Sequence, residues 1–384
     1  VDPHLEATVA EVTTLDVQVR AYASQIATGD AGEVNIWADA LVACVASHRR
    51  DSDPRQPDHA DAAGRRAMRL AAIADLSKAM FDAMEFGFLF DPGRQLLSIG
   101  YRDTDGGLDA NFYDLLASEA RLASFIAIAK GDVPAKHWFR LGRTLTPIDG
   151  SSGLISWSGS MFEYLMPSLV MRAPAGSLLA QTNRLVVWRQ EKYGDELDVP
   201  WGMSESEYNL RDIEKTYQYS SFGVPDLGYK RALGESTVIA PYASGLASMI
   251  DPAAAAHNYE RMAVIGACGV YGWYEAIDYT RTRLPEGVTF AVIHAYMAHH
   301  QGMTIVAIAN ALQDGRMRAR FHAEPIVRAA ELLLQERMPR DVAVARAPSF
   351  QATVAAEEAG PVPDSWRHYA SAHSRTPRTH LLSN

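Results

Sequence analysis

The sequence predicts a mainly α protein. Apolar residues recur at helical spacing along most of the chain, strand-like runs are few and short, and several helical segments end at a glycine, as helices commonly do. At 384 residues, with 48% hydrophobic and 21% charged residues, the chain is long enough to bury a large core in one or two domains.

The predicted helices follow one another along the chain and are separated by loops rich in glycine, proline and aromatic residues. A helical hairpin is predicted over 5–48, broken at 29–33, and a polar linker leads from it to a helix over 67–86. The remaining predicted helices cover 112–131, 161–171, 178–194, 242–266, 289–315 and 324–339. Strands are predicted at 88–91, 96–102 and 152–159.

The composition and the two ends of the sequence indicate the domain organisation and the kind of partner. The net charge of −10 argues against a nucleic acid partner, because there is no basic surplus to release counterions. The chain begins without methionine, has neither a signal peptide nor an apolar run that would span a bilayer, and ends in an alanine- and proline-rich stretch. We expect a piece of a longer polypeptide, with a helical segment and linker over 1–60, a catalytic domain over 61–340 and a linker over 341–384.

Glu163 is the single charged residue between positions 150 and 171. It admits two interpretations. It is either an acid at a helix N-terminus that faces solvent, where the helix dipole favours it, or a carboxyl in an apolar pocket whose raised pKa lets it donate a proton.

Acids and rings alternate between positions 195 and 222. Glu205 and Glu207 follow Trp201, although Ser204 with Glu207 also fits a simple capping box. Further along come the rings of Tyr208, Tyr217, Tyr219 and Phe222. Interleaved rings and acids suit a site that stacks on sugar faces and holds their hydroxyls.

The segment YGWYEAIDYT, residues 271–280, sets Glu275 and Asp278 among four aromatic rings. A buried carboxylate loses its hydration, so it must either be compensated by a partner or take part in the chemistry of the protein. Arg281 and Arg283 follow closely and could neutralise a structural pair. Alternatively, the segment lines a sugar cleft, with Asp278 holding a hydroxyl or an arginine.

No motif indicates a cofactor or a metal. The histidines of HAYMAHHQGM, His294, His299 and His300, are poorly spaced for a metal and suit hydroxyl hydrogen bonding or a buried structural role. The chain has no phosphate loop, GxGxxG motif or GxSxG elbow. With these classes of chemistry set aside, the sequence favours carboxylate chemistry beside aromatic rings, as in glycoside cleavage.

Several segments in one order resemble a known family. SWSGSMFEYLMP, PWGMSESEYN, TYQYSSFGVPDLGYKR, VIAPYASGLASM, YGWYEAIDYT and AYMAHHQGM are similar to the glycoamylase-like domain of bacterial cyclic β-1,2-glucan synthases. The resemblance covers about 67–339 and implies an (α/α) barrel of six helical hairpins. It also implies a place at the cytoplasmic face of the inner membrane, between a glycosyltransferase and a phosphorylase-like domain of the parent synthase, the latter beginning near the end of this chain.

The resemblance implies a transglycosylase that closes linear β-1,2-glucan into a ring by a retaining mechanism, without cofactor or metal. It assigns Glu163 as acid/base and Glu275 as nucleophile, with Glu205 and Glu207 as substitutes. The expected substrate-binding residues are Trp157, Tyr164, Trp201, Glu205, Glu207, Tyr208, Tyr217, Tyr219, Phe222, Tyr242, Trp273, Asp278, Tyr279, His299, His300 and Gln301. Two alternatives stay open, namely an inverting endo-β-1,2-glucanase and a non-catalytic glucan-binding module.

Overall fold

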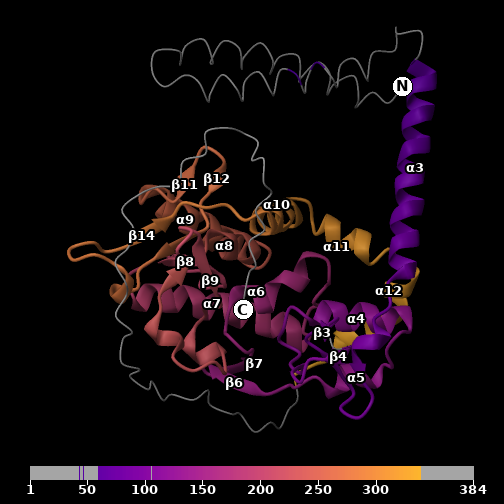
Figure 1. Ribbon diagram of the computed structural model, residues 1–384, viewed down its shortest axis with the longest axis horizontal. Helices are drawn as coiled ribbons and strands as arrows, with labels where there is room; N and C mark the ends of the chain where they lie inside the picture. The colour runs from indigo at the N-terminus through magenta and orange to yellow at the C-terminus, as the bar shows by residue number, and fades with distance from the viewer. Residues whose placement is uncertain (1–42, 44–45, 47–58, 105, 339–384) are drawn as a thin grey trace. The chain divides into compact units, whose positions relative to one another are not determined.

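The computed structural model describes Ala43, Ala46, residues 59–104 and residues 106–338, and the chain divides into two compact units, Val1–Glu85 and Phe86–Asn384. In the first unit, helix α3 (His59–Ala83) begins earlier than the helix predicted over 67–86 (Figure 1). The hairpin predicted before it and the linker predicted over 341–384 lie outside the described residues, apart from Ala43 and Ala46.

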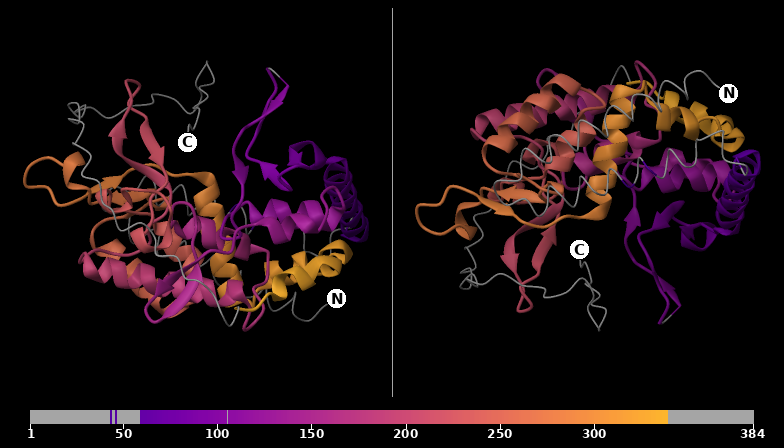
Figure 2. Two further views of the ribbon diagram at one scale, coloured as in Figure 1. Left: turned by 90° about the horizontal axis from the view of Figure 1, so that it is seen from below. Right: turned by 90° about the horizontal axis from the view of Figure 1, so that it is seen from above.

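The second unit is mainly helical, and its strands are short and antiparallel, which confirms the predicted class (Figure 1, Figure 2). Its α-helices are α4 (Arg121–Lys130), α5 (Lys136–Arg140), α6 (Met161–Leu165), α7 (Leu178–Glu196), α8 (Pro241–Ala247), α9 (Pro252–Val264), α10 (Ala298–Leu312), α11 (Arg316–Phe321) and α12 (Pro325–Ala330). Short 3-10 turns lie at Gly87–Leu89, Met166–Leu169, Pro225–Leu227, Leu233–Glu235, Arg281–Arg283 and Glu331–Gln335.

The strands form small separate sheets. β1 (Phe90–Asp91), β2 (Leu96–Ser98) and β5 (Phe112–Tyr113) make one sheet, and β10 (Val238–Ile239), β13 (Ala276–Asp278) and β14 (Ala291–Ile293) make another. The two-stranded pairs are β3 (Tyr101–Arg102) with β4 (Gly107–Leu108), β6 (Leu145–Ile148) with β7 (Ser151–Leu154), β8 (Ser206–Arg211) with β9 (Tyr217–Ser220), and β11 (Cys268–Gly269) with β12 (Gly272–Trp273).

Three of the predicted helices are wrong in part. The helix predicted over 242–266 is two helices, because Asp251 caps the backbone NH of Ala254 and Pro252 starts a new helix. The helix predicted over 289–315 begins only at Ala298, since residues 291–293 pair with β13 instead. The helix predicted over 112–131 likewise begins at Arg121, after strand β5 has paired with β2.

One large hydrophobic core joins α4 to α10, and it contains the buried rings of Phe125, Trp138, Tyr164 and Trp201. A smaller core lies under the β10–β13–β14 sheet around Phe222. Among the residues that the structure describes, no helix has both the length and the hydropathy of a bilayer span.

The loop before α6, residues 156–160, is packed against residues 222–229. The backbone NH of Ser156 donates to Leu227 O over 3.0 Å, and the NH of Tyr229 donates to Ser156 O over 3.0 Å. The approach is so close that a Cβ on Gly223 would lie 2.0 Å from Ser158 O. Only glycine fits there.

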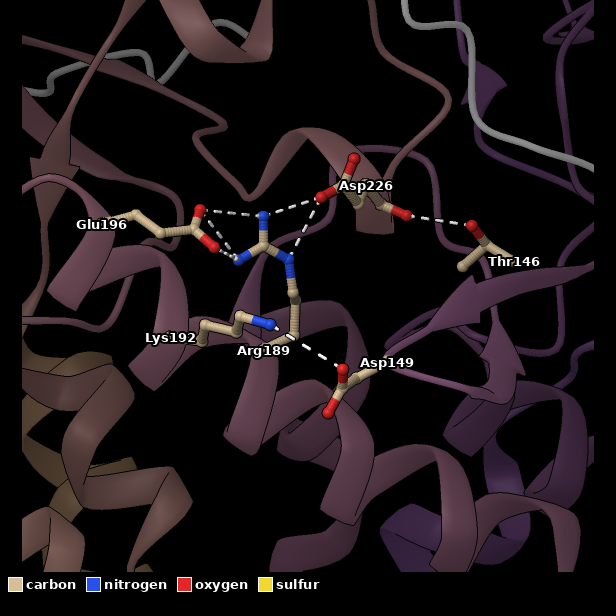
Figure 3. Close-up of polar contacts among 6 residues, drawn as sticks. All are labelled: Thr146, Asp149, Arg189, Lys192, Glu196 and Asp226. Atoms are coloured by element: carbon tan, nitrogen blue, oxygen red, sulfur yellow. Dashed lines mark hydrogen bonds and ion pairs between the residues drawn. The ribbon is translucent and has the colours of Figure 1, made fainter.

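An ion-pair network on α7 holds the same 222–229 segment from outside (Figure 3). Arg189 contacts Asp226 over 2.7 Å and Glu196 over 3.3 Å, and the Thr146 hydroxyl donates to Asp226 O over 3.1 Å. Asp226 is therefore fixed by both its side chain and its backbone carbonyl. This also fixes the 222–229 segment, which packs against Ser158.

Candidate active site

Glu163 lies in a cradle of serines, not in the apolar pocket that one of its two interpretations expected. Its carboxylate accepts hydrogen bonds from the hydroxyls of Ser156 (2.8 Å) and Ser158 (2.7 Å), from the Ser158 backbone NH (3.0 Å) and from Ser160 (3.3 Å). The helix-terminal interpretation was right about the position, because Ser160 and Glu163 form a capping box on α6. It was wrong about solvent, because Glu163 is only 8% exposed.

A buried arginine joins this cradle to the start of α4. Arg121 donates to the carbonyls of Ser118 (3.0 Å), Glu163 (3.0 Å) and Tyr164 (2.5 Å). Burial lowers its pKa to about 10, so it stays charged at neutral pH. It therefore fixes the residues before α4, among them Glu119, against α6.

Glu205 forms the first group of carboxylates together with Glu119 and Glu163. Burial and then the charges of Glu119 and Glu163 raise the pKa of Glu205 to about 7. Burial and the charge of Glu163 also raise the pKa of Glu119. Glu119 and Glu205 are only partly buried, and both keep some exposure to solvent.

Glu275, Glu207 and His300 form a second, more deeply buried group. His300 Nδ1 lies 2.8 and 3.0 Å from the two oxygens of Glu275, and the Glu207 backbone NH donates to Glu275 over 3.4 Å. Burial raises the pKa of Glu275 to about 8 and lowers that of His300 to about 3. Both shifts favour a hydrogen bond between a neutral acid and a neutral imidazole over an ion pair.

Two tyrosines connect the groups. The Tyr219 hydroxyl is hydrogen-bonded to the Glu205 carboxylate, and the charges of Glu205, Glu275 and Glu207 raise the pKa of Tyr219 after burial. The Tyr242 ring lies flat on His300, with centroids 3.7 Å apart, and its hydroxyl donates to Glu205 O over 2.9 Å. His300 is thus a support beneath the residues that hold Glu205.

Several predicted substrate-binding residues are core residues. Tyr164, Trp201, Phe222 and Tyr242 are almost fully buried, and the Tyr164 hydroxyl donates to Leu154 O and Leu227 O. The rings that remain accessible are those of Trp157, which is 48% exposed, and of Tyr208, Tyr217, Tyr219, Trp273, Tyr279 and His299. Gln301 is partly buried and donates to Trp273 O over 2.9 Å.

Asp278 holds an arginine, as one of its two interpretations expected. It is fully buried, and its oxygens accept from Arg283 (2.7 and 3.0 Å), from the Asn209 NH (3.0 Å) and from the Thr280 NH (2.9 Å). Since the carboxylate is occupied and buried, the structure offers no room for a substrate hydroxyl at Asp278.

Glu119 is the site residue that the sequence reasoning missed. It belongs to FYDLLASEARLASF, which was assigned to one continuous helix, so its acid counted as part of a helix surface. In the structure it precedes α4, and with Tyr113 it lines a cavity of 410 Å³.

The arrangement supplies two accessible carboxyls of raised pKa, an aromatic rim and a rigid buried support. Burial raises the pKa of both carboxyls and the charge of Glu163 raises it further, which suits proton transfer near neutral pH. Within 59–104 and 106–338, no three His, Cys, Asp or Glu side chains gather as metal ligands do.

Comparisons with known proteins agree with this fold. The chain is 51% identical over 320 residues to the cyclic β-(1,2)-glucan synthase NdvB of Rhizobium meliloti (strain 1021), and it spans 11% of that protein's length. Its fold matches an endo-β-1,2-glucanase from Chitinophaga pinensis in complex with sophorotriose and glucose (TM-score 0.54, 18% identity, 69% of this chain and 65% of that one).

A "putative glucoamylase" from Bacteroides fragilis NCTC 9343 matches similarly (TM-score 0.54, 16% identity, 77% of this chain and 69% of that one). These likenesses place the second unit in the α/α-barrel type of fold. The family described as "Glycoamylase: Putative glucoamylase" matches residues 111–325, more than half of the chain, so the chain belongs to the glycoamylase family.

Proposed function

We propose that this chain is a transglycosylase that cyclises linear β-1,2-glucan by a retaining mechanism, with Glu205 as nucleophile and Glu119 as acid/base. One observation carries the choice of residues. Glu205 is a half-buried carboxyl of pKa about 7 whose pKa responds to Glu119, while a tyrosine hydroxyl donates to it. The likeness to NdvB and to the endo-β-1,2-glucanase supports the choice of glucan.

The reaction runs in two displacements. A Glu205 oxygen bonds to the anomeric carbon as the glycosidic C–O bond breaks, and Glu119 gives its proton to the leaving oxygen. A hydroxyl at the far end of the same glucan then attacks the anomeric carbon, returns a proton to Glu119 and releases Glu205. The hydrogen bond from Tyr219 stabilises the ionised Glu205 that the first step needs.

The catalytic pair expected from the sequence, Glu163 and Glu275, stays a prediction. Their surroundings support a different role. Glu163 is fixed by three serines, and Glu275 is 2% exposed and bonded to His300. Both are better placed to shape the electrostatics and rigidity of the site than to touch an anomeric carbon.

The experiment incubates the 384-residue chain with linear β-1,2-glucan and analyses the products. We expect rings without new reducing ends. Short linear products would support an inverting endo-β-1,2-glucanase instead, and full conversion by both Glu205→Gln and Glu119→Gln would refute their catalytic roles. Binding without any conversion by the wild type would support a non-catalytic glucan-binding module.

Azide rescue separates the competing nucleophiles. If Glu205 is the nucleophile, Glu205→Ala regains turnover with azide and forms a glucosyl azide, because the small anion fills the space of the lost carboxylate. Rescue of Glu275→Ala and not of Glu205→Ala would restore the pair expected from the sequence. Glu260→Gln is the matched control, because that side chain on α9 is 79% exposed.

The parent assembly remains part of the proposal. A chain that spans 11% of a relative fits a domain that receives glucan from a glycosyltransferase region and precedes a phosphorylase-like one. Its place at the cytoplasmic face of the inner membrane is proposed on the same ground. Fractionation of cells that express the full-length protein tests it.

A further inference from the structure

We propose that Tyr271, Tyr274 and Tyr296 form a second glucan-binding surface, called here the tyrosine platform, which holds the chain at a distance from the reacting bond. The proposal rests on the proposed function, because it takes glucan as the ligand. The platform lies outside the carboxylate groups described above, although Tyr271 and Tyr274 belong to the YGWYEAIDYT segment that the sequence singled out.

The three rings form one packed cluster. The Tyr271 and Tyr296 rings meet edge to face with centroids 6.0 Å apart, and the Tyr274 and Tyr296 rings are 5.2 Å apart. His294 packs its edge on Tyr274 at 4.4 Å. Rings fixed against one another lose little freedom when a ligand binds, which favours binding by preorganisation.

The cluster is nevertheless open to solvent. Tyr271 is 63% exposed and Tyr296 is 37% exposed, at the hairpin of β11 and β12 and in the loop before α10. A contiguous group of exposed rings, unlike a single exposed ring, commonly marks a binding site.

A glycine is required for this packing. A Cβ on Gly269 would lie 2.5 Å from the Tyr274 hydroxyl and 2.6 Å from the Tyr296 hydroxyl. The two hydroxyls are hydrogen-bonded to each other, and burial and that bond raise the pKa of Tyr296 to about 12. The β11–β12 hairpin thus brings two polar groups and three rings together without adding charge.

The platform is close to the active site along the chain. Tyr296 precedes His299 by three residues, which span at most about 11 Å of chain. The His299 ring is 4.0 Å from that of His300, and the His300 ring is 6.2 Å from that of Tyr219, which holds Glu205. A chain bound at Glu205 can therefore extend over His299 to Tyr296.

The chemistry of the platform fits a neutral polyhydroxylated chain. Ring faces stack on the apolar faces of sugars, and phenol hydroxyls exchange hydrogen bonds with sugar hydroxyls. The neighbouring His294 adds no charge at neutral pH, because burial and Arg211 lower its pKa. A charged ligand would find no counter-charge in the three rings.

The test compares the affinities of a long linear β-1,2-glucan and of sophorotriose by titration calorimetry. We expect Tyr271→Ala to bind the long glucan about two- to tenfold more weakly and sophorotriose as well as the wild type does. Tyr271→Phe keeps the ring and should bind both normally. Phe139→Ala is the control, because that ring on α5 is 67% exposed and lies outside both sites.

The outcomes separate the two proposals. Unchanged affinity of Tyr271→Ala for the long glucan, in a protein that converts it, refutes the platform alone. An equal loss for both ligands also refutes it, since Tyr271 would then act at the reacting bond. A wild type that neither binds nor converts glucan refutes the proposed function and the platform's ligand together.

Discussion

Replacing Glu275 by glutamine tests the protonation of the buried pair with His300. Glutamine has the shape of a protonated glutamate. Its Nε2 can donate to His300 Nδ1, and its Oε1 can accept the Glu207 NH that now lies 3.4 Å from Glu275. The substitution therefore keeps the hydrogen bonds and removes only the titration of Glu275.

The sign of the effect follows from the raised pKa. Folding raises the pKa of Glu275 from 4.5 to about 8, so its contribution to stability is fully present below about pH 4.5 and is lost as the pH rises to about 8. At about 1.4 kcal/mol per pH unit, the loss is on the order of 5 kcal/mol. Glu275→Gln has no carboxyl to ionise and avoids this loss of stability. The variant should therefore become more stable than the wild type as the pH rises.

Urea unfolding of both proteins between about pH 5 and about pH 8 measures the difference in the free energy of unfolding. Glu207 titrates in both proteins, but burial and the charge of Glu275 raise its pKa, so relief of the repulsion from Glu275 adds to the difference in the same direction. If the pair is instead a glutamate anion with an imidazolium, Glu275→Gln strands a buried charge and costs about 3–5 kcal/mol at neutral pH. That result would refute the neutral pair. Glu260→Gln should change nothing.

Three further predictions concern the supports of the site. Tyr219→Phe removes a hydrogen bond from ionised Glu205, so the pKa of Glu205 should rise above about 7 and the acid limb of the pH–activity profile should move to higher pH; an unmoved limb contradicts it. Gly223→Ala should cost about 1–3 kcal/mol in thermal unfolding, because the new Cβ meets Ser158 O, and unchanged stability would refute the close contact. Asp278→Asn should destabilise by about 3–5 kcal/mol in urea without altering the affinity for glucan, whereas a selective loss of affinity would restore a substrate role.

The helical class and the acidic, aromatic character of the site could be predicted from the sequence, because both depend on local patterns. The 3.6-residue spacing indicated α7 correctly, and one interpretation of the lone acid Glu163 placed it at a helix start, as in α6. The β13–β14 pairing could not be predicted, since it joins segments whose apolar residues fit either period. Because of that ambiguity, the helix predicted over 289–315 began too early. In the same way, the helix predicted over 112–131 began too early and included Glu119.

The sequence by itself determined which acids and aromatic rings were available to the site. Only the tertiary structure decided which of them face a substrate. Glu163, Glu205 and Glu275 were all candidate acids in the sequence, yet serines surround the first and His300 holds the third, while Glu205 stays partly exposed. The physical reason is that burial and charge coupling depend on distances between segments far apart in the chain, and no local pattern contains those distances.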